Sequence, residues 1–378
     1  MKAVILAGGM GFRLRPLTRD KPKAFLRLAG RRLYEYSLSY VETAGIRDVI
    51  LVVPQGYSGF LEAPGNVAVV EQEKPGIEGA ISAGLREAGG EEVVLTFTGY
   101  LSWPPNIVSQ VVNYYASSGY PLVMAVASVI TGAETYGFVK LGIGSRVEDV
   151  QFDRREDWLS GRGFVFAGVM VGDPGVISTL TTGYEDGLSV AARKGLVGAT
   201  VWGGRWLEIG YPWDLLRAPE LVVRPHTTLL SGGSSIEGSA VIRGPVVVSD
   251  GAYIGDNTVI RGPAYIGKRA RIEDGSVVGP RVIVDDGSVV GPGSVVRETV
   301  LMEGAEVGPK CVVEGSVVGE GASLSPFTYI EAGTPERLPE RLRGVLASSL
   351  GEIRLGAIIA PRRRVEPYTV TGKGAMIE

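Results

Sequence analysis

The sequence is poor in cysteine, which forms disulfides, and in histidine, which carries the imidazole group. Among 378 residues it has one cysteine, Cys311, and one histidine, His226. A single cysteine excludes an intrachain disulfide and gives no sign of an oxidising compartment. Lys and Arg number 38 against 41 Asp and Glu, so we expect neither nucleic acid nor a membrane as a partner. The N-terminal run MKAVILAGG is too short for a signal peptide, and no apolar stretch approaches a membrane span. We therefore expect a cytoplasmic protein.

Glycine, in contrast, is abundant, and the chain is long enough for two domains. Up to about residue 225, short apolar runs alternate with helical patterns. We expect strands at 2–6, 48–53, 67–70 and 93–97, and helices at 33–44 and 78–88. Strands that alternate with helices predict a Rossmann-like, mostly parallel sheet with helices on both faces. We assign residues 1–228 to this α/β domain.

Beyond Ser235 the hydrophobic period becomes six. Aliphatic residues recur at this interval from Ile236 to Val296, slip by one residue near Met302, and continue to Leu324. Each repeat fits one side of a triangular coil, and stacked coils bury one continuous aliphatic column. The spacing predicts a left-handed parallel β-helix over residues 229–378. A charged excursion at about 332–350 interrupts it, and Ile353, Ile359 and Val365 indicate a closing coil.

The first expected strand leads into a glycine-rich loop. Glycines after a first parallel strand let backbone N–H groups approach phosphate oxygens. The segment LAGGMGFRLRPLTRDKPKAFLRLAG closely resembles the signature of the sugar-1-phosphate nucleotidyltransferases, roughly LAGGxGTRLRPLT followed by PKxLLPVxG. Residues 206–218, WLEIGYPWDLLRA, resemble that family's W-x-D-I-G-T-P-x-D-L-L segment. Some members, including bifunctional archaeal ones, also carry a hexapeptide β-helix.

The resemblance implies a nucleotide site and a sugar-phosphate site. It assigns nucleotide binding to Gly8, Gly9, Gly11, Arg13, Gln72 and Gly76. It gives Arg13 and Lys23 the catalytic contacts with phosphate, because positioning and charge neutralisation supply nearly all of the catalysis in phosphoryl transfer. Tyr136 and Gly137 match the family's Y-G element on the sugar side. The implied substrates are a nucleoside triphosphate and a sugar-1-phosphate, or a nucleotide-sugar, with Mg²⁺ as the expected cofactor.

Several family positions carry other side chains. Phe12 replaces a threonine of the loop, and the G-T-A-G-A element reads Gly-Ile77-Glu78-Gly-Ala, which puts a carboxylate near the expected nucleotide. Tyr100 stands where the family has a metal-binding aspartate, and a neutral phenol is a poor Mg²⁺ ligand. Glu208 keeps the charge of the second metal position. The family's sugar-phosphate lysine element falls near Phe152, and its N-A-G element begins with Phe166.

These departures leave three functions open. The first is sugar-1-phosphate nucleotidyl transfer, with the metal held by Glu208. The second is a catalytically degenerate nucleotide-sugar-binding protein that regulates an active paralogue. The third, acyl transfer by the β-helix, is disfavoured because Pro326 stands where related domains have a histidine base, and His226 lies far away in sequence. In each case we expect a homo-oligomer formed through the β-helix.

Overall fold

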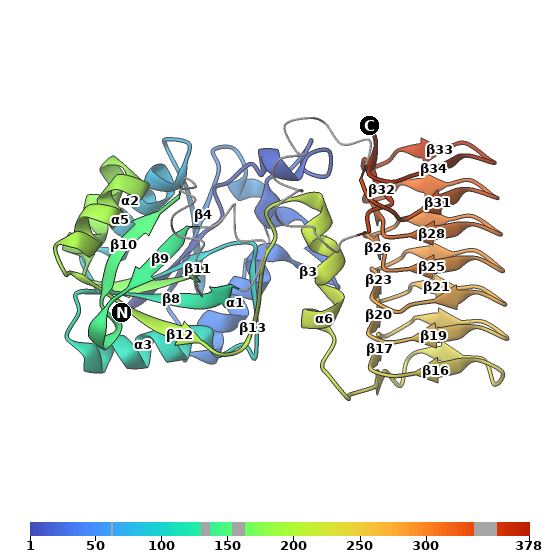
Figure 1. The fold of residues 1–378 in the computed structure, drawn as a ribbon, viewed down its shortest axis with the longest axis horizontal. Helices are drawn as coiled ribbons and strands as arrows, with labels where there is room; N and C mark the ends of the chain where they lie inside the picture. Colours follow the sequence, from blue (N-terminus) through green and yellow to red (C-terminus); the bar gives the residue numbers. More distant parts are fainter. Residues whose placement is uncertain (62, 130–136, 153–162, 336–353) are drawn as a thin grey trace.

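The computed structural model describes residues 1–61, 63–129, 137–152, 163–335 and 354–378. Figure 1 shows two parts side by side, a sheet flanked by helices and a stack of coils. The chain passes from the first part to the second between helix α6 (Pro219–Val222) and strand β14 (Leu229–Leu230). Ile353 and most of the charged excursion fall outside the described residues.

The N-terminal sheet has the strand order β10-β9-β11-β6-β1-β4-β5, and β8 and β12 extend it from β11. Its half around β1 is parallel, as β1 lies between β4 and β6 and β4 pairs with β5. Strand β11 runs antiparallel to β6, β8 and β9, so the sheet is mixed. The strands are β1 (Lys2–Leu6), β4 (Val49–Val53), β5 (Val67–Glu71), β6 (Val93–Phe97), β8 (Leu122–Val129), β9 (Phe138–Leu141), β10 (Val147–Gln151), β11 (Gly163–Gly172) and β12 (Val197–Trp202).

Helices cover both faces of this sheet. Helices α1 (Leu33–Thr43) and α3 (Ile107–Ser118) pack one face through Val41 and Val111. Helices α2 (Ile77–Ala88) and α5 (Tyr184–Arg193), with the short α4 (Pro174–Ser178), pack the other. Smaller elements connect these layers. They are β2 (Arg27–Leu28), β3 (Arg31–Arg32), β7 (Tyr100–Trp103), β13 (Arg205–Glu208) and the 3₁₀ helices η1 (Phe12–Leu14), η2 (Lys23–Phe25), η3 (Ser58–Phe60), η4 (Ile143–Ser145), η6 (Thr179–Thr182) and η7 (Pro212–Arg217).

The C-terminal part is a β-helix with three parallel walls. The inner wall comprises β14, β17 (Val246–Val248), β20 (Ala264–Ile266), β23 (Val282–Val284), β26 (Val300–Leu301), β29 (Val317–Val318), β32 (Ala357–Ile359) and β35 (Ala375–Ile377). The second wall comprises β15 (Ser235–Ile236), β18 (Tyr253–Ile254), β21 (Arg271–Ile272), β24 (Val289–Val290), β27 (Glu306–Val307), β30 (Ser323–Leu324) and β33 (Arg364–Val365). The third wall comprises β16 (Val241–Arg243), β19 (Val259–Arg261), β22 (Val277–Val278), β25 (Val295–Arg297), β28 (Val312–Glu314), β31 (Tyr329–Glu331) and β34 (Val370–Gly372).

The aliphatic residues in six-residue phase point into this β-helix and form one buried cluster. The slip predicted near Met302 occurs where Leu301, five residues after Val296, takes the inward position. A second five-residue step separates Val313 from Val318. The fold class expected from the sequence, an α/β domain followed by a left-handed β-helix, is confirmed.

The inner wall faces the N-terminal part (Figure 1). Its outward residues Ile283, Val317 and Ile358 are fully buried in a cluster that also contains Leu17 and Trp213. At the edge of this cluster, the Arg27 guanidinium lies 2.9 Å from Asp286 and 3.0 Å from Glu303. The backbone N–H of Gly30 donates to Asp285 at 2.7 Å. The two parts therefore share an apolar core, which positions the loops between β1 and α1.

Candidate functional site

A pocket of about 780 Å³ opens at the carboxyl ends of the parallel strands. Leu6 and Phe97 end strands β1 and β6, while Pro54 and Gln72 follow β4 and β5. Ligands of α/β sheets bind at this edge, where the loops converge. The pocket brings together nearly all of the sequence-predicted site residues: Gly8, Gly9, Gly11, Arg13, Lys23, Gln72, Gly76, Tyr100, Gly137 and Glu208. Tyr136 lies outside the described residues.

The side chain of Gln72 lines the pocket and packs against Gly8 of the glycine loop. Its side chain is 5% exposed, and its Nε2 donates to the carbonyl of Gly8 at 3.5 Å. Its Oε1 is buried and has no hydrogen-bond partner among the described residues. An unsatisfied buried acceptor costs free energy, so this atom is prepared to accept a hydrogen bond from a ligand.

Lys23 reaches the pocket between two glycines in the left-handed region. It begins η2, and its backbone N–H donates to the carbonyl of Gly9 at 3.2 Å. Gly11 has φ 70°, and a Cβ there would lie 2.8 Å from the Cβ of Lys23. Gly99 has φ 91°, and a Cβ there would overlap the end of the same side chain. Burial lowers the pKa of Lys23, and the Glu208 carboxylate opposes that shift.

Arg13 and Glu208 form an ion pair across the pocket. The Nη2 of Arg13 lies 3.3 Å from Oε1 of Glu208, which is nearly buried, while Arg13 is half exposed. The guanidinium also lies over the ring of Tyr211, 5.2 Å from its centroid. Burial alone would lower the pKa of Arg13, but Glu208 and Tyr211 raise it overall. Two cationic side chains of the pocket, Arg13 and Lys23, therefore lie near the Glu208 carboxylate, and Glu73 and Glu185 also line the pocket.

Tyr100 is the cross-strand neighbour of Glu208. Strands β7 and β13 pair antiparallel, with Tyr100 opposite Glu208. The Tyr100 ring packs 5.8 Å from that of Phe166 and 6.0 Å from that of Trp206. It presses against Gly168, where φ is 84° and a Cβ would overlap the ring. Tyr100 is therefore part of an aromatic wall.

Further aromatic residues that line the pocket continue that wall. The ring of Phe97 packs 5.0 Å from Phe166 and 5.7 Å from Tyr184, and Phe152 packs 5.6 Å from Tyr184. We call Phe97, Tyr100, Phe152, Phe166 and Tyr184 the aromatic end. Sequence reasoning noted Tyr100, Phe152 and Phe166 as substitutions, but it missed Phe97 and Tyr184. Phe97 ends an ordinary apolar strand and Tyr184 begins a helix, so no local sequence pattern marked either residue.

The other departures lie in different places. Phe12 is 66% exposed at the rim, where Arg15 lies 4.9 Å from its ring centroid. Ile77 lines the pocket at the first turn of α2. The expected carboxylate of Glu78 instead accepts a hydrogen bond from the backbone N–H of Tyr184 at 3.1 Å. Glu78 therefore anchors the start of α5, while its Oε2 lies beside Gly76.

The carboxylates suit a metal only in part. In the described segments, no group of three or more His, Cys, Asp or Glu residues is arranged to hold a metal ion. Asp214 is engaged elsewhere, since its Oδ2 accepts from the backbone N–H groups of Gly210 and Tyr211 at 2.8 and 2.6 Å. Glu208 thus offers one carboxylate. Mg²⁺ in phosphate-binding sites commonly takes one or two carboxylates and completes its shell with phosphate oxygens and water, so Glu208 fits such an ion.

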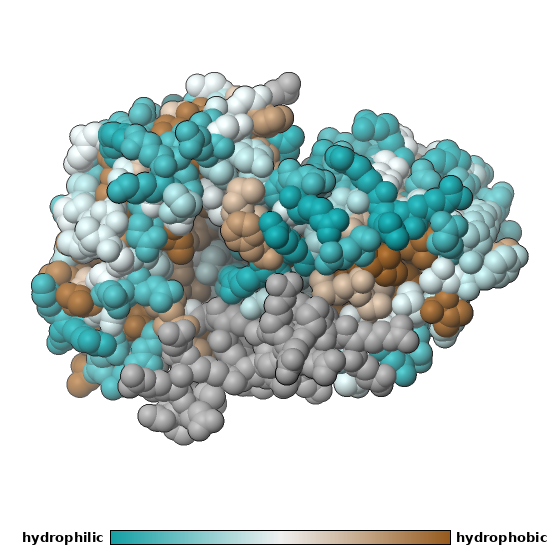
Figure 2. Space-filling view, turned by 90° about the horizontal axis from the view of Figure 1, so that it is seen from above, coloured by the Kyte–Doolittle hydropathy of each residue, from teal (hydrophilic) through white to brown (hydrophobic). Residues whose placement is uncertain are grey.

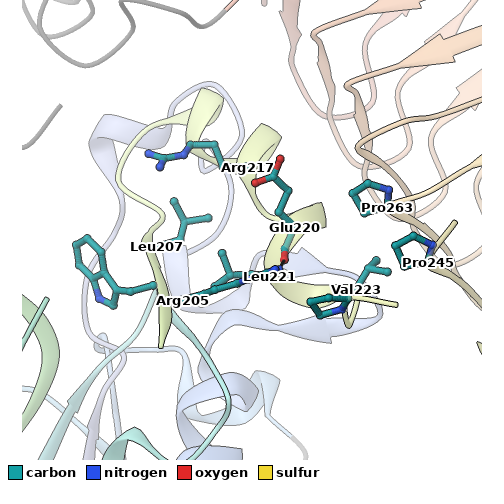
Figure 3. A pocket seen from close by; sticks show the side chains of 10 residues that line it. Arg205, Leu207, Arg217, Glu220, Leu221, Val223, Pro245 and Pro263 are labelled. Carbon is teal, nitrogen blue, oxygen red and sulfur yellow. Dashed lines mark hydrogen bonds between the residues drawn. The ribbon is translucent and has the colours of Figure 1, made fainter. Parts of the chain in front are cut away.

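A second groove, of about 520 Å³, lies at the junction of the two parts. Figure 3 shows Arg205, Leu207, Arg217 and Glu220 on one side and Pro245 and Pro263 of the β-helix on the other. Arg205 donates to the carbonyl of Glu220 at 2.5 Å. In the view from above, the two parts form lobes with a notch between them (Figure 2). None of the sequence-predicted site residues lines this second groove.

The geometry defines a nucleotidyltransferase-type domain joined to a β-helix, and comparisons with known proteins agree. Residues 3–141 match the family model for the MobA-like NTP transferase domain, and residues 260–378 match that for the GMPPB C-terminal domain. A bifunctional sugar-1-phosphate nucleotidylyltransferase/acetyltransferase of Sulfurisphaera tokodaii is 24% identical over 267 residues, 68% of this chain and 64% of the relative. Mannose-1-phosphate guanylyltransferase 1 of Arabidopsis thaliana is 24% identical over 276 residues, 68% of this chain and 75% of the relative.

Solved structures agree in fold. A putative glucose-1-phosphate thymidylyltransferase from Bacillus anthracis superposes with a TM-score of 0.50 at 18% identity, covering 58% of this chain and 93% of that one. A UDP-glucose pyrophosphorylase superposes with a TM-score of 0.51 at 16% identity, covering 57% and 96%. This chain therefore resembles the sugar-1-phosphate nucleotidyltransferases, as its sequence indicates. It spans less than two thirds of the length of the archaeal bifunctional relatives, 64% and 62% for two of them.

In the described part of the chain, no helix is both long and apolar enough to cross a membrane.

Proposed function

We propose that this chain is a sugar-1-phosphate nucleotidyltransferase, which joins a nucleoside triphosphate to a sugar-1-phosphate and releases pyrophosphate. One observation carries the proposal: the glycine loop, Arg13 and Lys23 converge on one pocket at the carboxyl ends of the parallel strands. An oxygen of the sugar phosphate attacks the α-phosphorus, and the bond to the β-phosphate breaks. Such a reaction needs positioning and positive charge more than covalent chemistry by the protein.

Each side chain has a role that fits its place. Backbone N–H groups of Gly8, Gly9 and Gly11 cradle the triphosphate. Arg13 neutralises charge on the leaving pyrophosphate, and its planar fork suits phosphate oxygens. Lys23, between Gly11 and Gly99, contacts the α-phosphate and the attacking phosphate.

Base recognition falls to Gln72. Its buried Oε1 is a free acceptor at the floor of the pocket, so it fits a base that presents an N–H donor on its pairing edge. Gln72→Glu keeps the acceptor but buries a charge, whereas Gln72→Leu removes the acceptor. We expect both variants to lower selectivity among the triphosphates, measured as competition against a fluorescent nucleotide.

We assign Mg²⁺ to Glu208. The ion, when bound, offsets negative charge on the triphosphate. Glu208 would hold the ion through its carboxylate, and Arg13, released from its contact with Glu208, would be available to phosphate. The rings of the aromatic end line the pocket together with Gly137, and we assign the sugar to this part of it. Ring faces favour the apolar face of a sugar over a densely hydroxylated edge.

Tyr100 supports a second candidate. A site that lacks one metal carboxylate fits a protein that binds nucleotide-sugar and regulates an active paralogue. The two functions separate in one experiment, in which the chain is incubated with each triphosphate and sugar-1-phosphate and products are resolved by ³¹P NMR. A nucleoside diphosphate sugar together with pyrophosphate supports the enzyme. Saturable binding without product supports the regulatory partner.

We also propose that the chain acts in the cytoplasm, where nucleoside triphosphates are available, and that it associates with itself through the β-helix. A closed symmetric assembly is the usual outcome when one surface of a protein recognises another copy of itself.

A further inference from the structure

One corner of the β-helix carries a carboxylate in three successive coils. Asp286, Glu303 and Glu320 each stand two residues after an inward position of the inner wall, and strand pairing sets these positions one above another. We call the three residues the acidic ladder. In the same coils, the outward residues Ile283 and Val317 are buried against the N-terminal part. The acidic ladder therefore borders the surface through which the two parts meet.

Basic side chains from the segment before α1 pair with the acidic ladder. The guanidinium of Arg27 lies 2.9 Å from Asp286 and 3.0 Å from Glu303. The ammonium group of Lys21 pairs with Glu320, and these two side chains are only 25% and 27% exposed. Partly buried ion pairs are screened less by salt than pairs in open solvent. Two basic residues of one short segment therefore engage all three carboxylates.

Lys23 lies between these two basic residues in the sequence. Lys21 precedes it by two residues, and Arg27 follows it by four. The turn between them is ordered, because the backbone N–H of Leu26 donates to the carbonyl of Lys23 at 3.1 Å. Leu26 is also buried in the apolar cluster that includes the inner wall. The β-helix thus holds the turn that carries Lys23 at both of its ends.

The glycine loop holds the same lysine from the side of the pocket. The backbone N–H of Lys23 donates to the carbonyl of Gly9 at 3.2 Å, and its side chain extends between Gly11 and Gly99. The turn therefore reaches from the glycine loop to the β-helix. In phosphoryl transfer the protein acts mainly by positioning charge, and a displacement of about 1 Å can cost about 100-fold in rate.

We propose that the acidic ladder is a positioning element for Lys23, so that the β-helix sets the rate of nucleotidyl transfer in the N-terminal pocket. This inference rests on the proposed function. Among the described residues that line the pocket, none belongs to the acidic ladder. Its carboxylates therefore act through the turn that carries Lys23 and not on the substrate.

Removing two of the three charges tests this inference in the full-length protein. Glu303→Gln with Glu320→Gln should lower kcat for pyrophosphate release by about tenfold or more. The affinity for triphosphate and the melting temperature should change little, because the glycine loop and the apolar cluster remain. Asp286 is left in place, since it also accepts a backbone hydrogen bond within the β-helix. The matched control is Glu314→Gln, because Glu314 is 22% exposed and pairs with Arg297 of the β-helix itself.

Two further variants separate positioning from general damage. Lys21→Glu with Glu320→Lys reverses one ion pair and should restore most of the rate that either single change loses. In a Lys23→Met protein, the two glutamine changes should cause no further loss, because they act through the lysine that is already absent. An unchanged kcat in the double variant would overturn the inference, as would an equal loss with and without Lys23.

A measurement without substrates keeps this inference distinct from the proposed function. Acetic anhydride modifies lysine amines, and mass spectrometry follows each lysine separately. Lys23 should react at least about fivefold faster when Glu303 and Glu320 are replaced, because the turn opens locally, while exposed Lys194 reacts equally in both proteins. A wild type that forms no product would overturn the proposed function. Unchanged modification of Lys23 in the double variant would overturn the positioning role by itself.

Discussion

Arg13 donates a hydrogen bond to Glu208, with 3.3 Å between Nη2 of the guanidinium and Oε1 of the carboxylate. One partner is assigned to phosphate and the other to a metal. Under the proposed function, a triphosphate with its cation would meet both side chains in place and would have to separate them. Arg13 is half exposed but Glu208 is nearly buried, so separating the pair without a cation for Glu208 would leave a buried carboxylate unpaired.

Removing the arginine should weaken nucleotide binding. Arg13→Ala is expected to weaken triphosphate affinity by about 1–3 kcal/mol, or roughly 5- to 150-fold, because a charged hydrogen bond is lost. Arg19→Ala is the matched control, since Arg19 is exposed and pairs with Glu378. Calorimetry measures both. Equal affinities for the two variants would show that the glycine loop does not serve as the phosphate cradle.

Restoring the family carboxylate should raise turnover. Tyr100→Asp places a second carboxylate opposite Glu208 in the β7–β13 ladder, where Mg²⁺ gains a hard oxygen ligand. We expect Mg²⁺-dependent product formation to increase. Tyr100→Asn removes the ring equally but adds no charge, so it isolates the carboxylate. If the asparagine and aspartate variants behave alike, Tyr100 does not stand in for a metal ligand. In that case Glu208→Ala should still abolish activity.

Buried Asp285 should make the domain junction sensitive to pH. Burial raises the pKa of Asp285 to about 6, despite hydrogen bonds from Gly30 and Asp286. An unfolded aspartate has a pKa of about 3.9. The folded chain therefore holds this proton between about pH 4 and 6, where the unfolded chain has lost it. Its contribution to the free energy of unfolding falls as pH rises through this window, by about 3 kcal/mol in total, and is constant above it.

Urea denaturation at pH 4.5, 5.5 and 7 measures this effect. Asp285→Asn should flatten the dependence without removing it, because burial also raises the pKa of Asp214 to about 6. Identical pH dependence in the wild type and the variant would contradict the assignment.

The inward and outward positions of the β-helix should differ sharply in tolerance. Val290→Asp buries an unpaired charge in the aliphatic column, where Val290 is 0% exposed, and should cost several kcal/mol. Val289→Asp is the adjacent outward position and should cost less than about 1 kcal/mol. Thermal unfolding compares them. Similar melting temperatures would contradict the inward phase of the six-residue pattern.

The repeat made the β-helix predictable, because every coil must place an aliphatic residue inside and the spacing is therefore visible in the sequence. The glycine loop was also predictable, because its backbone requires glycine and the glycines are visible in the sequence. Gly11 and Gly99 both have positive φ, and both leave room for the side chain of Lys23. The antiparallel strand β11 was not predictable from local pattern, since its buried run GFVFAGVMVG reads like a parallel strand.

Contacts between residues far apart in the sequence could not be predicted either. The pairing of Arg13 with Glu208 joins residues 195 positions apart, and the aromatic end assembles from β6, β7, β11, α5 and the residue after β10. The contact of Arg27 with Asp286 likewise joins the two parts across 259 positions. Residues so far apart show no regular spacing in the sequence, so their contact is seen only in the folded structure.

The most direct test of the account is pyrophosphate release with Mg²⁺, compared between the wild type, Lys23→Met and Lys194→Met. Lys194 is exposed at the end of α5 and serves as the matched control. We predict release that requires both a triphosphate and a sugar-1-phosphate, equal in the wild type and Lys194→Met, and at least about 100-fold slower in Lys23→Met because the reacting phosphates lose their nearest cation. No release from any substrate pair, or equal release by Lys23→Met and the wild type, would contradict nucleotidyl transfer at this pocket.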